Sequence, residues 1–130
     1  MKIVNLTPHA INIISPDDYT SNPAIRKLVA KADVTPIASI PSYKVASATI
    51  DTTESEPIDG IPVFDKNITN VEPLPEFDGE ECIYIVSALY ATAYKRIYPD
   101  SDARLYTVAD PVYTEDGRTI LGSRGICPAF

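Results

Sequence analysis

His9 is the only histidine of this chain and the side chain best suited to acid–base chemistry, and it stands in the segment Asn5-Leu6-Thr7-Pro8-His9. An imidazole titrates near neutral pH, so His9 could act as a general acid or base in phosphodiester cleavage. No aspartate, glutamate or cysteine stands beside it, so it cannot build a metal site by itself. The competing interpretation is structural, because a polar side chain in a turn commonly satisfies backbone groups. The sequence predicts no metal and no cofactor, and it favours the structural role for His9 over the catalytic one.

Two arginines near the end of the chain could hold a phosphate or a carboxylate. Arg118 and Arg124 flank Gly122, and forked guanidinium groups beside a flexible glycine suit such anions. Isolated arginines are more commonly solvated at the surface, so solubility is the alternative interpretation.

Ser87 stands at the start of a helical pattern, where unpaired N–H groups and the positive end of the helix dipole favour an anion. A helix cap is the simpler role for this serine, because the flanking glycines of a nucleophile elbow are missing. Tyr90 follows one turn later, and its ring could stack on a base or pack in the core or in a subunit interface.

Together with two polar residues of the opening segment, these side chains form the predicted ligand-binding set. Its members are Asn5, Thr7, His9, Ser87, Tyr90, Arg118 and Arg124. No catalytic residue is predicted, because no pair of carboxylates has a spacing that marks an acid–base dyad.

Length, charge and cysteine content narrow the class of protein and of partner. A chain of 130 residues predicts a single globular domain, residues 1–130. The net charge of −7 disfavours a nucleic-acid polymer as partner, because such binding depends on lysine and arginine neutralising phosphates.

No apolar run is long enough for a membrane span or a signal peptide, so we expect a soluble, cytoplasmic protein without a membrane partner. Cys82 and Cys127 are predicted to be reduced thiols in the core, with one disulfide as the alternative.

Short strands are predicted to position the candidate residues. Lys2–Leu6 and Ala10–Ile14 alternate and predict an opening hairpin or strand pair, and the apolar run Cys82–Val86 predicts a central strand. Ile61–Asp65 and Ile68–Val71 predict two short strands joined around Lys66-Asn67. The segment Asp51–Asp59 is acidic and predicted to be exposed. Glu115–Arg118 predicts a hairpin turn with Asp-Gly at its centre.

Two helices are expected. Asn22 can cap a first helix that carries Ile25, Leu28, Val29 and Ala32 at helical spacing. Ser87 can cap a second, with an apolar stripe that ends before Pro99. The predicted fold class is α+β: a mostly antiparallel sheet or partly open barrel of about seven short strands with two helices.

The chain resembles a family of small uncharacterised proteins from bacteriophages and bacteria. The resemblance lies in the opening Asn5–His9 with the apolar alternation that follows, in Tyr84-Ile85-Val86-Ser87 entering a helix, and in Asp116-Gly117-Arg118 with Gly122 near the end. It implies a phage or bacterial protein, but it implies no particular reaction.

We expect from these features a non-enzymatic, homo-oligomeric protein that binds a small anionic, nucleotide-like ligand between subunits, such as a sponge that counters a host defence. One alternative is a phosphodiesterase-type enzyme acting on a cyclic nucleotide, with His9 as acid or base and Arg118 or Arg124 stabilising the developing charge. A second alternative is a protein-binding inhibitor that acts through its acidic face.

Overall fold

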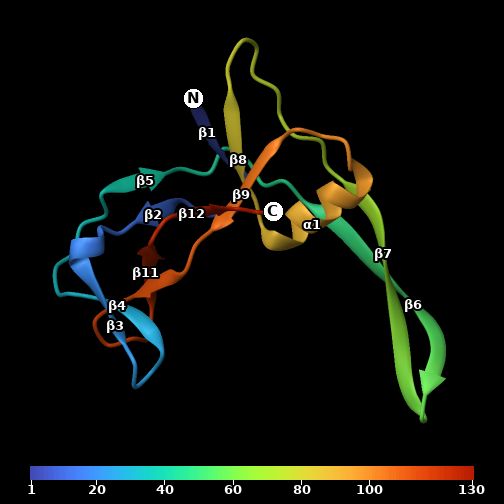
Figure 1. Cartoon of the computed structure of the whole chain (residues 1–130), viewed down its shortest axis with the longest axis horizontal. Helices are drawn as coiled ribbons and strands as arrows, with labels where there is room; N and C mark the ends of the chain where they lie inside the picture. Colours follow the sequence, from blue (N-terminus) through green and yellow to red (C-terminus); the bar gives the residue numbers. More distant parts are fainter.

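The computed structural model describes residues 1–130 as twelve strands and a single α-helix (Figure 1). The strands are β1 (Lys2–Asn5), β2 (Ile11–Ile13), β3 (Tyr19–Asn22), β4 (Lys27–Ala30), β5 (Ala38–Ile40), β6 (Ala48–Ile58), β7 (Ile61–Val71), β8 (Cys82–Ile85), β9 (Arg104–Val108), β10 (Pro111–Tyr113), β11 (Ile120–Ser123) and β12 (Ile126–Pro128). The helix is α1 (Ala88–Ile97), and a 3-10 turn, η1, covers Pro16–Asp18.

A four-stranded sheet with the order β1-β8-β9-β12 forms the centre of the molecule. The apolar strand β8 lies between β1 and β9 and is parallel to both, which confirms its predicted central position. Parallel neighbours need a crossover connection, and α1 supplies it between β8 and β9. The main core lies between this sheet and α1, and it includes Val4, Leu6, Val86, Tyr90 and Leu105.

Helix α1 forms where the sequence predicts it. The Ser87 hydroxyl accepts a hydrogen bond from the Tyr90 backbone N–H at 3.1 Å, which is the predicted cap. The helix ends at Ile97, before Pro99. Its buried residues, Tyr90, Ala91 and Ala93, face the core.

A second, six-stranded sheet has the order β3-β4-β10-β11-β2-β5 and a small core of its own around Ile14, Ala30 and Val112. Strand β11 runs close against β2, so that a Cβ added to Gly122 would lie 2.6 Å from the Asn12 carbonyl oxygen. Only glycine fits at this crossing. The predicted turn at Asp116-Gly117 does join β10 to β11.

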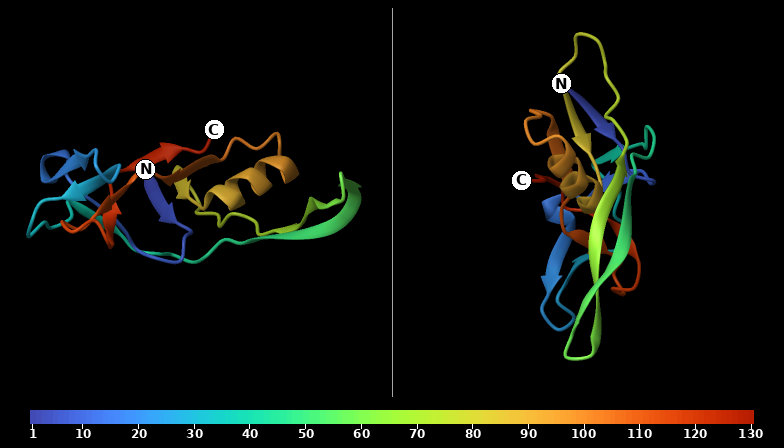
Figure 2. Two further views of the ribbon diagram at one scale, coloured as in Figure 1. Left: turned by 90° about the horizontal axis from the view of Figure 1, so that it is seen from below. Right: turned by 90° about the vertical axis from the view of Figure 1, so that its right-hand side faces the viewer.

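The third sheet is a two-stranded hairpin, β6 with β7, that extends away from the other two sheets (Figures 1 and 2). We call residues 48–71 the arm. Its strands pair from Ala48↔Val71 to Ile58↔Ile61. Asp59 and Gly60 connect them with φ of 49° and 79°, values typical of a type I′ turn, the tight turn that matches strand twist.

The predicted fold class is wrong: the molecule is mostly sheet, with one helix instead of two and three open sheets instead of a partly open barrel. The helix expected from Asn22 onwards is the β3–β4 hairpin. The Asn22 side chain accepts a hydrogen bond from the Ala24 N–H at 3.1 Å, and Arg26 has a φ of 55°, which a helix excludes. Leu28 and Val29 then pair with β3 on one side and with β10 on the other.

The strand pairing also differs from expectation. Strands β1 and β2 form as predicted but belong to different sheets, and four of the nine strand pairs are parallel: β1 with β8, β8 with β9, β10 with β4 and β11 with β2. The two short strands expected after Gly60 are one continuous strand, β7, and the acidic segment before Gly60 is strand β6. Both cysteines are free, as predicted, but their predicted place in the core is wrong: Cys82 is partly buried and Cys127 is exposed. The single helix is too short to cross a membrane.

Candidate functional site

The side chain of Asn5 is buried and fully used inside the chain. Its Nδ2 donates to the backbone carbonyls of His9 at 2.9 Å and Ile40 at 3.0 Å. Its Oδ1 accepts from the backbone N–H of Thr7 at 2.9 Å and from the Thr7 hydroxyl at 2.6 Å. Asn5 thus closes the opening turn and ties it to β5, and neither polar atom is left for a ligand.

His9 lies exposed on the same turn, where its backbone carbonyl takes part in these hydrogen bonds. No group of three or more histidine, cysteine or acidic side chains that could hold a metal ion occurs in the chain.

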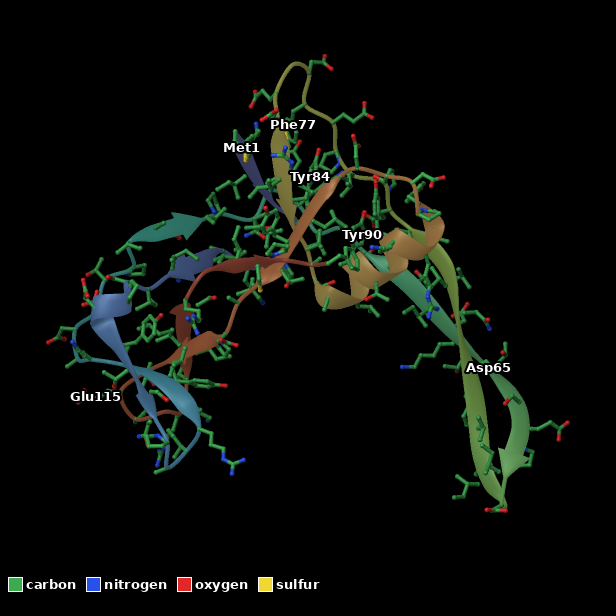
Figure 3. All side chains as sticks on the ribbon, in the orientation of Figure 1. Met1, Asp65, Phe77, Tyr84, Tyr90 and Glu115 are labelled. Atoms are coloured by element: carbon green, nitrogen blue, oxygen red, sulfur yellow. The ribbon has the colours of Figure 1, made fainter.

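Ser87 and Tyr90 both stabilise the helix and its packing. Ser87 caps α1, and the Tyr90 hydroxyl donates a hydrogen bond to the Glu72 carbonyl just after the arm (Figure 3). Burial, followed by the neighbouring Tyr94 and Glu72, raises the pKa of Tyr90 to about 12. This phenol is therefore neutral at physiological pH and anchors the helix to the base of the arm.

The two arginines lie at opposite ends of β11. Arg118 follows the Asp116-Gly117 turn, and its backbone N–H donates to the Asp116 carboxylate at 3.0 Å. Arg124 follows β11 and forms an exposed ion pair of 3.3 Å with Asp110. The seven predicted ligand contacts thus occupy the opening turn, the start of α1 and the two ends of β11, and none of them lines any of the five principal cavities.

The largest cavity, which we call the edge groove, has a volume of about 730 Å³ and lies at the turn between β3 and β4. Its lining includes Arg26, Lys27 and Asp110 together with the ring of Tyr113. The Lys27 ammonium donates to the Gly117 carbonyl at 3.1 Å and lies 4.3 Å from the centre of the Tyr113 ring. Two cations beside an aromatic ring suit an anion that carries a planar group.

A second cavity of about 560 Å³, which we call the helix groove, lies between α1 and the base of the arm. The arm contributes Ile50, Lys66 and Ile68, and the helix contributes Ala88, Leu89, Thr92, Ala93 and Arg96. The lining is mostly apolar and carries two cations without any acid.

The far end of the arm, which we call the tip, exposes large apolar side chains. Ile58 is 64% exposed, Ile61 65% and Phe64 56%. Glu54, Glu56 and Asp59 lie among them and are exposed as well. The sequence signal for this feature is Asp59-Gly60 between two strand-forming segments, a hairpin pattern that the acidic composition of the first strand obscures.

No protein-family model, curated protein or solved structure matches this chain.

Proposed function

We propose that this protein acts by binding another protein chain, without catalysis, and that the arm is the element that binds. The observation that carries this proposal is the exposed apolar tip at the end of a hairpin that has no core of its own beyond its base. Ile58 and Ile61 form a cross-strand pair on one face of the hairpin, and Phe64 lies on the other, so the tip exposes large apolar side chains on both faces. Large apolar side chains gathered in this way at an exposed end of a protein typically mark an interaction site. An isolated two-stranded hairpin is also only marginally stable in water, so a bound partner would stabilise it.

The charge of the arm supports a protein partner. The arm carries the acids Asp51, Glu54, Glu56, Asp59 and Asp65 against one lysine, Lys66. Acidic groups around an apolar centre favour the approach of a partner with a basic rim and limit non-specific association with other proteins. This arrangement favours the hypothesis of a protein-binding inhibitor over that of an enzyme, since the polar candidate residues do not gather around any cavity.

The proposal is tested by replacing the apolar side chains of the tip. In the triple variant I58T/I61T/F64T, threonine keeps strand propensity and removes apolar surface. We expect its far-UV circular dichroism to match the wild type, while the protein loses the binding partners that the immobilised wild type captures from a bacterial lysate and loses any self-association.

A matched control replaces three exposed apolar residues away from the arm, I37T/V45T/I120T. This control should bind as the wild type does. If the tip variant retains the same captured proteins and the same self-association as the wild type, the arm is not the binding element.

A second candidate function is the binding of a small nucleotide-like anion, and the edge groove favours it. Its volume lies within the range of roughly 300–1,000 Å³ that is usual for ligand pockets. Arg26 and Lys27 would hold the charged group and Tyr113 the base. Titration calorimetry against a panel of cyclic and linear nucleotides tests this candidate: we expect heat with the wild type and none with R26A, and no heat with any nucleotide would dismiss it.

A further inference from the structure

Given the proposed binding role of the arm, on which this inference rests, we propose that its partner is a second copy of this chain. The tip of each arm would dock in the helix groove of the other copy. The tip is exposed and lies at the far end of the arm from α1 (Figures 1 and 3), whereas α1 and the base of the arm line the helix groove.

The helix groove offers an apolar floor with a cationic border. Ala93 forms part of the floor, and Leu89 is 54% exposed beside it, an unusual position for a leucine on a helix that packs against a core. Lys66 and Arg96 lie on the lining of this groove, and no acidic side chain lies with them to neutralise their charge. An apolar segment with negative charges therefore complements it.

The tip has the matching chemistry. Phe64 provides apolar surface on the face of the hairpin that also carries Glu54, and Ile58 and Ile61 provide apolar surface on the opposite face beside the turn. Glu54 and Glu56 provide negative charge close to Phe64. Once the tip is seated, each carboxylate would face a cation of the other copy, and the apolar side chains would leave water together with Leu89. Both partners of this contact occur in every copy of the chain.

The arm itself fixes which face takes part. Ile50↔Ile68, Thr52↔Lys66 and Glu54↔Phe64 are successive cross-strand pairs, so their side chains share one face of the hairpin. Helix α1 covers this face at its base, over the first of these pairs. Further out the same face is open and carries Lys66, Glu54 and Phe64.

The length and direction of the arm make the contact reciprocal. Strands of 11 residues span roughly 36 Å, so the tip lies far from the groove of its own chain. Two arms that lie antiparallel, with the open faces together, place each tip at the base of the other arm. One two-fold rotation then makes both contacts and closes the assembly as a dimer.

Charge reversal and rescue in the full chain test this arrangement by sedimentation equilibrium. The tip variant E54K/E56K and the groove variant K66E/R96E should each weaken dimerisation by about tenfold or more, because each places like charges in both contacts. The combined variant E54K/E56K/K66E/R96E should recover most of the wild-type affinity. The control E80K/E81K makes the same change of net charge away from the arm and should dimerise as the wild type does.

Cross-linking provides a readout that does not depend on charge. In a background with C82A and C127S, a protein with F64C is mixed with one carrying L89C and oxidised. A cross-link of dimer mass should form in the mixture and not with either protein alone. Absence of this cross-link, or lack of rescue in the combined variant, would overturn the proposed docking.

The outcomes separate this inference from the proposed function. A wild-type chain that stays monomeric, but captures a different protein that I58T/I61T/F64T fails to capture, would contradict the second copy as partner and leave the arm as binding element. A monomeric wild type for which the tip variant changes no captured protein would contradict both.

Discussion

The phenolic hydroxyl of Tyr90 in α1 donates a hydrogen bond to the backbone carbonyl of Glu72, the residue that directly follows the arm. Tyr90 is 1% exposed and belongs to the main core together with Val71, the last residue of β7. The helix that borders the helix groove is thereby joined to the base of the arm. The direction of the arm and the shape of the groove depend on the same buried contact.

Replacing Tyr90 with phenylalanine should destabilise the protein. Y90F leaves the ring in the core but leaves the Glu72 carbonyl without its donor, and an unsatisfied buried acceptor costs about 1–3 kcal/mol. Urea denaturation measures the change. The control is Y98F, because the Tyr98 side chain is 40% exposed and should cost little. Equal losses in the two variants would contradict an anchoring role for Tyr90.

Stability should fall in alkaline solution, in part because of the same residue. Burial raises the pKa of Tyr90 from 10.0 to about 12 in the folded chain. Between these pH values the unfolded chain has lost the Tyr90 proton while the folded chain keeps it, so the free energy of unfolding decreases as pH rises. This contribution is complete below pH 10. Denaturation at a series of pH values should show a smaller alkaline loss in Y90F than in the wild type, whereas parallel curves would contradict the raised pKa.

The opening turn should respond to Asn5 and not to His9. N5A leaves the Ile40 carbonyl and the N–H of Thr7 without their partner and removes one of the two donors to the His9 carbonyl, so we expect a loss of roughly 2 kcal/mol or more. H9A removes an exposed side chain and should change stability by less than about 0.5 kcal/mol. Thermal denaturation of both variants decides between a structural Asn5 and an Asn5 kept for ligand binding, since the latter would leave N5A as stable as H9A.

The carboxyl group of Asp116, in the turn that precedes Arg118, should have a pKa below that of an ordinary aspartate. The Thr114 hydroxyl, at 2.6 Å, and the backbone N–H of Arg118 stabilise the Asp116 carboxylate and lower its pKa. In T114V the main cause of the shift is removed, so the pKa of Asp116 should rise toward its ordinary value. An NMR titration of the Asp116 side chain measures this, and an unchanged pKa would show that Thr114 has no such effect.

The sequence is informative where structure is decided locally. The apolar run at β8, the cap at Ser87 and the Asp116-Gly117 turn all form as predicted, because each depends on neighbours in the chain. The spacing of Ile25, Leu28 and Val29 is compatible both with a helix and with one half of a hairpin. The segment forms strand β4 because it pairs with β10, more than eighty residues away in the chain. No local sequence pattern predicts that pairing.

The candidate site was harder to predict for the same reason. The polar side chain of Asn5 suggests a ligand contact, but its partner at Ile40 is contributed by a distant strand. The sequence does not predict the arm as one long hairpin, because exposed strands lack the apolar alternation that is required of strands packed against a core. Its turn, Asp59-Gly60, carries the same signal as Asp116-Gly117 and could have identified the hairpin.

The most direct test of the arm as a self-docking element is the mass of the protein in solution. Sedimentation equilibrium over a range of concentrations should give a wild-type mass that rises from 14.2 kDa toward twice that value. The variant I58T/I61T/F64T should stay at 14.2 kDa at the same concentrations, and I37T/V45T/I120T should follow the wild type. A wild type that remains at 14.2 kDa throughout, or a tip variant that dimerises equally well, would contradict the account.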